Sequence, residues 1–170
     1  THNVSSAASD VYKRQDIPYY VLDYTESFSK NVVDNFTQMY AQGLTPNPCV
    51  ECNRSVKFDH FINQAKKLNC DKVATGHYAK IIKKNDNYEL HKADYLDKDQ
   101  SYVLHMLQSS DLENITFPLG EISKPEVRQI AARIGLRTAF KKDSQDICFV
   151  GKKDYRSFVE KRIDLTSPGE

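Results

Sequence analysis

Apolar side chains recur at the three- and four-residue spacing of a helix in two stretches of the chain. The first stretch holds Phe28, Val32, Val33, Phe36, Met39 and Tyr40, and the second holds Phe58, Phe61, Ile62, Ala65 and Leu68. Gly43 follows the first stretch at the place where a left-handed residue ends a helix. The prolines of 45–48 push the residues before them toward extended conformations, so the pattern predicts a rigid loop between the two helices.

Other stretches of the chain have the short apolar runs or the alternation of β-strands. Apolar runs predict strands at 19–24, 71–75 and 146–150. Residues 79–83 and 88–92 alternate on either side of an Asn-Asp-Asn turn, which predicts a β-hairpin.

Helical signals dominate the last third of the chain. Ser123 and Glu126 form a capping-box pattern ahead of an apolar helical repeat, and 153–163 reads as a basic helix. A shorter helix is expected around 101–107. Strands alternate with helices through the first two thirds, so the chain is expected to be an α/β layer followed by a small, mainly helical appendage.

The composition is typical of a folded protein. The 170 residues are 39% hydrophobic and 28% charged. No apolar run is long enough for a membrane span or a secretory signal, so we expect no membrane contact and a reducing, cytoplasmic setting. Residues 1–15 are polar and aperiodic, and we expect a disordered or foreign leader there and a fragment of a longer protein overall.

Charge and glycine spacing exclude some functions and leave others open. The formal net charge of +1 excludes a histone-like polycation, but residues 124–162 hold eleven basic against five acidic residues. That excess is typical either of a solvated helical surface or of a face for a polyanion. The six glycines lie at least fifteen positions apart, which excludes a Walker loop or a GxGxxG motif within this chain.

The cysteines fit a zinc ribbon poorly. Cys49 and Cys52 form a CxxC, and Cys70 follows at a suitable interval, but the fourth ligand should lie near Val73. His77 is the nearest substitute. Cys70 is more simply interpreted as a small buried hydrophobic residue.

Two of the cysteines have surroundings that favour a thiolate. Cys52 lies between a proline-stiffened loop and a helix, so it can face the positive end of that helix. Cys148 follows the basic pair Lys141 and Lys142 on a predicted strand. Two such thiols, 96 positions apart, fit a pair that exchanges sulfur or electrons across a cleft.

Five segments, in order, resemble the tRNA-specific 2-thiouridylase (MnmA) family. They are GLTPNPCVECNRSVKFDHF (43–61), ATGHYAK (74–80), DKDQSYVL (97–104), FPLGEISKPEVRQIA (117–131) and KKDSQDICFVG (141–151). The resemblance implies the later part of an N-type ATP pyrophosphatase (Rossmann-like) domain over 16–113 and a small, mainly helical, central tRNA-binding domain over 114–170. The family's phosphate loop and its C-terminal barrel are absent here.

The resemblance also assigns roles to individual residues. Cys52 matches the family's nucleophile, Cys148 matches the cysteine that carries a persulfide, and Gly76 matches an ATP contact. Residues that match tRNA contacts are Asn47, Pro48, Cys49, His77, Lys98, Asp99 and Gln100. Many members have Asp in place of Cys49. The cysteine at this position keeps open an iron–sulfur site made of Cys49, Cys52 and Cys148.

The activity implied is transfer of sulfur to the C2 position of the wobble uridine of tRNA. ATP, with Mg²⁺, adenylates the C2 oxygen, and the Cys148 persulfide then supplies sulfur, leaving AMP, pyrophosphate and a Cys52–Cys148 disulfide. The implied partners are the tRNA anticodon loop and a sulfur-relay protein or cysteine desulfurase. The alternatives are a non-enzymatic iron–sulfur or zinc-binding module and an inactive tRNA-binding fragment, and we expect this truncated chain to be inactive alone.

Overall fold

Two long helices form one half of the molecule in the computed structural model, which describes residues 18–143, 147–151 and 154–163. The first helix runs without a break through α2 (Thr25–Phe28), η1 (Ser29–Asp34) and α3 (Asn35–Ala41). Its central part, η1, has the wide turns of a π-helix. Gly43 follows with φ +73°, which confirms the predicted left-handed residue after the helix.

The second long helix begins ten residues earlier than its apolar pattern predicts. It comprises α4 (Pro48–Glu51), the wide-turned η2 (Cys52–Phe58) and α5 (Asp59–Lys67). Asn47 begins it, because the Asn47 side chain accepts a 3.1 Å hydrogen bond from the backbone N–H of Cys49 and Pro48 occupies the first turn. The CxxC therefore lies within a helix, and its predicted placement on the rigid loop is wrong.

The strands are short and form two separate two-stranded sheets. β1 (Val73–Ala74) pairs in parallel with β4 (Ile115–Thr116). The predicted hairpin is confirmed as β2 (Ala79–Lys84) and β3 (Asn87–Lys92), with Asn85 at φ +55° in the connecting turn. β4 belongs to the same packed unit as β1, just beyond the domain boundary expected at 113/114.

Two predicted strands are wrong. Residues 18–24 have no regular structure and are mostly exposed, because no strand among the described residues lies beside them to complete a hydrogen-bonded ladder. In the strand expected over 146–150, Asp146 lies outside the described residues. The rest is a turn in which the Val150 N–H donates to the Ile147 carbonyl at 3.0 Å.

The remaining helices are short except for one. They are η3 (Leu96–Lys98), η4 (Ser101–Val103), α6 (Ser109–Leu112), α7 (Lys124–Arg133) and α8 (Tyr155–Glu160). The predicted capping box is present at α7, where Ser123 and Glu126 each accept a hydrogen bond from the other's backbone N–H. α7 buries none of its own residues, and α7 and α8 are the helices described beyond residue 114, so a packed helical domain is not seen in this part of the structure.

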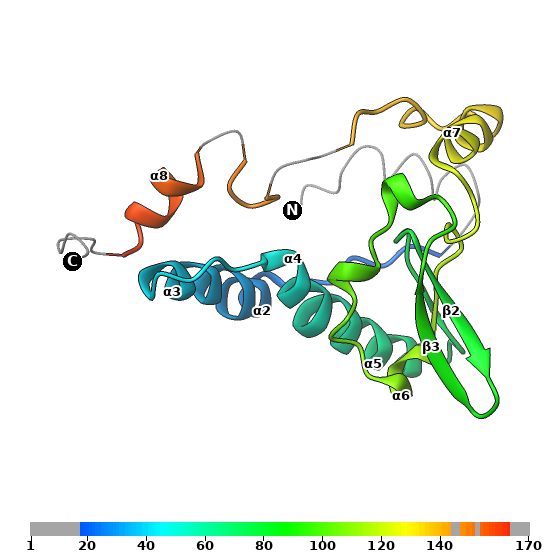
Figure 1. Cartoon of the computed structure of the whole chain (residues 1–170), viewed down its shortest axis with the longest axis horizontal. Helices are drawn as coiled ribbons and strands as arrows, with labels where there is room; N and C mark the ends of the chain where they lie inside the picture. The colour runs from blue at the N-terminus through cyan, green and yellow to red at the C-terminus, as the bar shows by residue number, and fades with distance from the viewer. Residues whose placement is uncertain (1–17, 144–146, 152–153, 164–170) are drawn as a thin grey trace.

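The core lies where the second long helix meets the strands. Phe58 and Ile62 of the helix pack with Val73, Ala79, Val103, Leu104, Ile115 and Phe117. Figure 1 shows α5 running toward the β2–β3 hairpin, with α7 at one end of the molecule and α8 above α3 at the other. No helix among the described residues is long and apolar enough to cross a membrane.

Candidate functional site

Cys52 lies one turn inside the second long helix, at the first residue of η2. Its side chain is half-buried, whereas Cys49, one turn earlier, is exposed. Wide π-type turns shift side chains from their ordinary helical positions and are common at functional sites. Cys52 is the first residue of such a wide-turned segment.

Cys148 approaches the same helices because its neighbour is anchored on them. The ring of Phe149 packs edge-on against Phe28 at 5.7 Å and Phe36 at 5.3 Å between ring centroids. The ring of Phe158 in α8 covers it from the other side at 5.3 Å. This aromatic cluster of Phe28, Phe36, Phe149 and Phe158 anchors the turn on the first long helix and leaves Cys148 exposed.

The Cys52 thiol lies within electrostatic range of Cys49 and Cys148. The pKa of Cys52 is raised, first by burial, and then by negative charge on Cys148, Cys49 and Glu51, while Lys57 opposes the rise. The predicted thiolate at Cys52 is therefore wrong for this state, because Cys52 lies inside the helix and burial outweighs the nearby lysine. All four cysteines are free thiols.

The described residues do not form a metal-binding cluster. Among residues 18–143, 147–151 and 154–163, no three His, Cys, Asp or Glu side chains lie close enough together to hold a metal ion. The set of Cys49, Cys52 and Cys148 is thus not arranged as iron–sulfur ligands.

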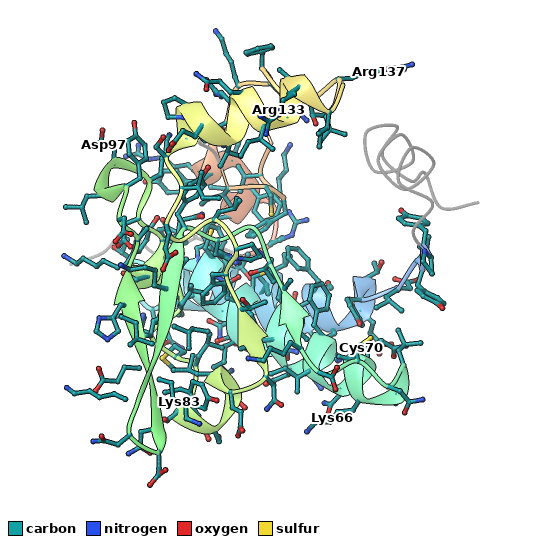
Figure 2. The ribbon with its side chains drawn as sticks, turned by 90° about the vertical axis from the view of Figure 1, so that its right-hand side faces the viewer. Lys66, Cys70, Lys83, Asp97, Arg133 and Arg137 are labelled. Carbon is teal, nitrogen blue, oxygen red and sulfur yellow. The ribbon has the colours of Figure 1, made fainter. Side chains whose placement is uncertain are left out.

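Cys70 follows α5 and is exposed, so its predicted burial is wrong. Figure 2 shows Cys70 near Lys66, at the opposite end of the molecule from Arg133 and Arg137.

Gly76 and His77 follow β1 but have different surroundings. A Cβ at Gly76 would touch only Leu119, at 3.7 Å, so packing within the described residues does not require glycine there. His77 is buried between the rings of Phe58 and Phe117, and its Nδ1 is 2.8 Å from the Thr75 hydroxyl. Burial, aided by Lys57, lowers the pKa of His77 to about 4, so the ring is neutral at physiological pH.

The segment Lys98–Gln100 divides into one surface residue and two that hold the loop. The Asp99 carboxylate accepts hydrogen bonds from the Ala93 N–H at 2.9 Å and the Ser101 hydroxyl at 2.7 Å. Burial raises the pKa of Asp99, but these hydrogen bonds outweigh burial and leave that pKa below its usual value. Gln100 accepts from the Tyr78 N–H at 3.1 Å, whereas the partly exposed Lys98 ammonium pairs with Asp143 at 2.9 Å.

An open pocket of about 390 Å³ connects Gly76 with this loop. Its lining residues are Gly76, Tyr78, Asp97, Lys98, Asp99, Gln100, Tyr102, Lys124 and Asp143. Asp143 pairs there with Lys98 and Lys124, each at 2.9 Å. The sequence alone indicated no site role for Asp143, Tyr78 or Lys124. The only sequence signal was the basic excess over 124–162, which does not show that an acid lies at the centre of the basic group.

Comparison with known proteins identifies the family. Residues 1–152 match the family model described as the tRNA methyl transferase HUP domain. The chain belongs to this family. The match includes residues 1–15, where a leader was expected, and these residues lie outside the described part of the chain. The match also continues past residue 113, into the region expected to form a separate domain.

Similar proteins share one name. The chain is 47% identical over 162 residues to a protein of Leptospira interrogans, 51% identical over 144 residues to one of Chloroflexus aurantiacus, and 46% identical over 165 residues to one of Rickettsia peacockii. Each of these is named tRNA-specific 2-thiouridylase MnmA. The alignments cover 95%, 84% and 94% of this chain but 43%, 40% and 45% of the relatives, so the chain spans less than half of their length.

Proposed function

We propose that this chain is part of a tRNA 2-thiouridylase and that Cys52 and Cys148 transfer the sulfur. The observation that carries the proposal is the convergence of two thiols, 96 positions apart in sequence, on one pair of packed helices. The family description names methyl transfer, but methyl transfer has no need for two adjacent thiols. The names of the similar proteins support thiolation.

The chemistry needs the uracil C2 oxygen to become a leaving group. ATP supplies this when the C2 oxygen attacks its α-phosphate, so that pyrophosphate leaves and an adenylated base forms. The outer sulfur of a Cys148 persulfide then bonds to C2, and AMP departs with the oxygen. The Cys52 thiolate attacks the inner sulfur of that persulfide and breaks its S–S bond, whose electrons remain on the transferred sulfur. A Cys52–Cys148 disulfide is left for a thiol reductant to reopen.

The raised pKa of Cys52 suits a thiol that should react late. At neutral pH it is protonated in this state, because burial outweighs the attraction of Lys57. A protonated Cys52 does not attack the Cys148 persulfide before the base is in place. Loss of the Cys52 proton is then part of the step that releases sulfur.

The substrate contacts are assigned from both resemblance and position. Asn47 and Cys49 are exposed at the N-terminal turn that precedes Cys52, and Pro48 between them is buried. We assign this turn to the target base of the anticodon loop, which must leave its stack to react. Lys98 is the further RNA contact, whereas His77, which the resemblance also assigns to RNA, is buried between two aromatic rings and acts by packing. Asp99 and Gln100 act by holding the Lys98 loop.

The nucleotide is assigned to the pocket beside Gly76. A glycine there lets a phosphate approach the backbone, and Lys98 and Lys124 supply the positive charge that phosphates require. Mg²⁺ accompanies the ATP. The glycine spacing excludes a phosphate loop within the chain, so we expect no pyrophosphate release from ATP by the chain alone.

Three further assignments complete the proposal. Residues 16–113, with β4 packed against them, belong to the pyrophosphatase domain, and the rest of 114–170 belongs to a central tRNA-binding domain. The sulfur donor is a relay protein or a cysteine desulfurase, and the setting is the cytoplasm.

The decisive test replaces the matching segment of the Leptospira interrogans relative with this chain. In a strain that lacks 2-thiouridine, the chimera should restore 2-thiouridine in tRNA, as measured by nucleoside mass spectrometry. Cys52→Ser and Cys148→Ser should each abolish it, whereas Cys70→Ser, which changes an exposed and remote thiol, should not. Normal thiolation in either of the first two variants, or an inactive unmutated chimera, would contradict the proposal.

A further inference from the structure

Asp143 lies at the centre of a cluster of basic side chains from two elements, η3 and α7. Its two carboxylate oxygens lie 2.9 Å from the Lys98 Nζ of η3 and 2.9 Å from the Lys124 Nζ of α7. Arg128, one turn further along α7, places Nη2 3.9 Å from the same carboxylate. These hydrogen bonds from the lysines hold the pKa of Asp143 down at about 2, so it is fully ionised.

The cluster is organised, in contrast to a chance surface ion pair. Isolated exposed pairs contribute little because the side chains are free to move. Here one carboxylate bridges two elements, and Arg128 also donates to the Lys141 carbonyl at 3.5 Å, which ties the same segment to α7 a second time. The lysines are only 38% and 25% exposed, so their charges are partly shielded from solvent.

The cluster has room for a ligand on both sides. One pocket, of about 460 Å³, lies over Lys124, Arg128 and Asp143, and the pocket beside Gly76 shares Lys98, Lys124 and Asp143 with it. Three cations face one carboxylate at their centre. Of the other acids in these pockets, Asp99 is committed to the Ala93 N–H and Ser101, and Asp97 lies at the outer end of the loop (Figure 2).

A second observation in the same place indicates a missing ligand. The Tyr78 side chain is 95% buried and lines the pocket, yet its hydroxyl has no hydrogen-bond partner among the described residues. Arg128 Nε is likewise buried without a described partner. Buried donors without partners are costly, and both lie where an oxyanion bound to Lys98 and Lys124 would also reach.

We infer that Lys98, Lys124 and Arg128 form a phosphate site in which the Asp143 carboxylate is an internal competitor for the phosphate. The inference deepens the proposed function and depends on it for its ligands. The shared chemistry is a phosphate group, supplied either by the RNA backbone or by the nucleotide. Asp143 neutralises the cluster when no phosphate is present, and an incoming phosphate must take over the same donors.

Removing the Asp143 charge should therefore strengthen phosphate binding. Fluorescence anisotropy would measure the affinity of the whole chain for an unmodified tRNA transcript at several salt concentrations, and calorimetry would measure its affinity for ATP. Asp143→Asn should bind one of these ligands roughly threefold to tenfold more tightly at low salt, and the tRNA arm should show a salt slope steeper by about one. The arm that responds identifies the source of the phosphate.

Matched variants separate competition from a general charge effect. Glu89→Gln also removes a carboxylate paired with a lysine, Lys84 at 3.6 Å, but on the β2–β3 hairpin, and it should change the affinity much less. Asp143→Glu keeps the charge and should bind like the unmutated chain. Lys124→Gln should weaken binding, and in the double variant the gain from Asp143→Asn should shrink.

The alternative role for Asp143 is to hold the lysines in place, and it predicts the opposite sign. Under that role, Asp143→Asn would lower the affinity for both ligands, and an unchanged or lower affinity in a variant with normal circular dichroism overturns the inference. Absence of any binding by the unmutated chain would overturn it as well. If Asp143→Asn leaves phosphate binding unchanged while the chimera still makes 2-thiouridine, this inference fails and the proposed thiolation stands. The two failures are therefore distinguishable.

Discussion

At the scale of single residues, the structure separates side chains that hold the fold from those that are free to react. His77 belongs to the first group, although its sequence motif marks it as an RNA contact. It lies between two aromatic rings, bonds the Thr75 hydroxyl, and is only 9% exposed. Cys148 belongs to the second group, since it is exposed while its neighbour Phe149 carries the packing.

The burial of His77 predicts a pH-dependent stability. Its pKa is about 4 in the folded chain against 6.5 when unfolded, so the unfolded state binds the extra proton as the pH falls from 6.5 to 4. Over that window His77 should cost the native state about 3 kcal/mol. In urea titrations, the stability advantage of the unmutated chain over His77→Gln should shrink by about that amount between pH 7 and pH 4. A constant difference across this range would show that His77 is not buried and neutral.

At the scale of elements, the close approach of one loop to the hairpin tests the packing. A Cβ at Gly120 would lie 2.1 Å from the Ala79 carbonyl oxygen and 2.8 Å from Lys80, both in β2. The backbone of β2 must move to make room, so Gly120→Ala should lower the unfolding free energy by roughly 3 kcal/mol or more.

The control for Gly120 is a glycine with open space around its Cα. Gly76 has no contact shorter than 3.7 Å, so Gly76→Ala should change the midpoint of a thermal melt far less. Equal losses in the two variants would mean that the loop does not pack against β2 as described.

Local sequence signals predicted the elements that are stabilised locally. The hairpin with its Asn turn, the Ser123–Glu126 capping box and the left-handed Gly43 depend on neighbouring residues, and all are confirmed. The strands expected at 19–24 and 146–150 failed because a strand depends on a distant partner, which a short apolar run does not reveal. The second helix starts early because the Asn47 cap acts ahead of its apolar pattern.

At the scale of the whole molecule, the sequence predicted a pair of reactive cysteines but not the contacts that hold them. The motifs around Cys52 and Cys148 suggested a pair, whereas the aromatic cluster that anchors Phe149 involves residues from 28 to 158 and has no sequence spacing to reveal it. The same is true of Asp143, whose partners lie 19 and 45 positions away. Burial of Cys52 also reversed the charge state that its sequence surroundings favour.

The measurement that tests the account most directly is cross-linking of Cys52 to Cys148 with a short bifunctional thiol reagent. In a Cys49→Ser, Cys70→Ser background, the cross-link should form within one molecule at a rate independent of protein concentration, because neighbouring thiols have a high effective concentration. A Cys49→Ser, Cys148→Ser background, which leaves Cys52 with the remote Cys70, is the matched control and should not cross-link. Equal yields in the two backgrounds, or none in the first, would contradict the pairing of thiols on which the proposed sulfur transfer depends.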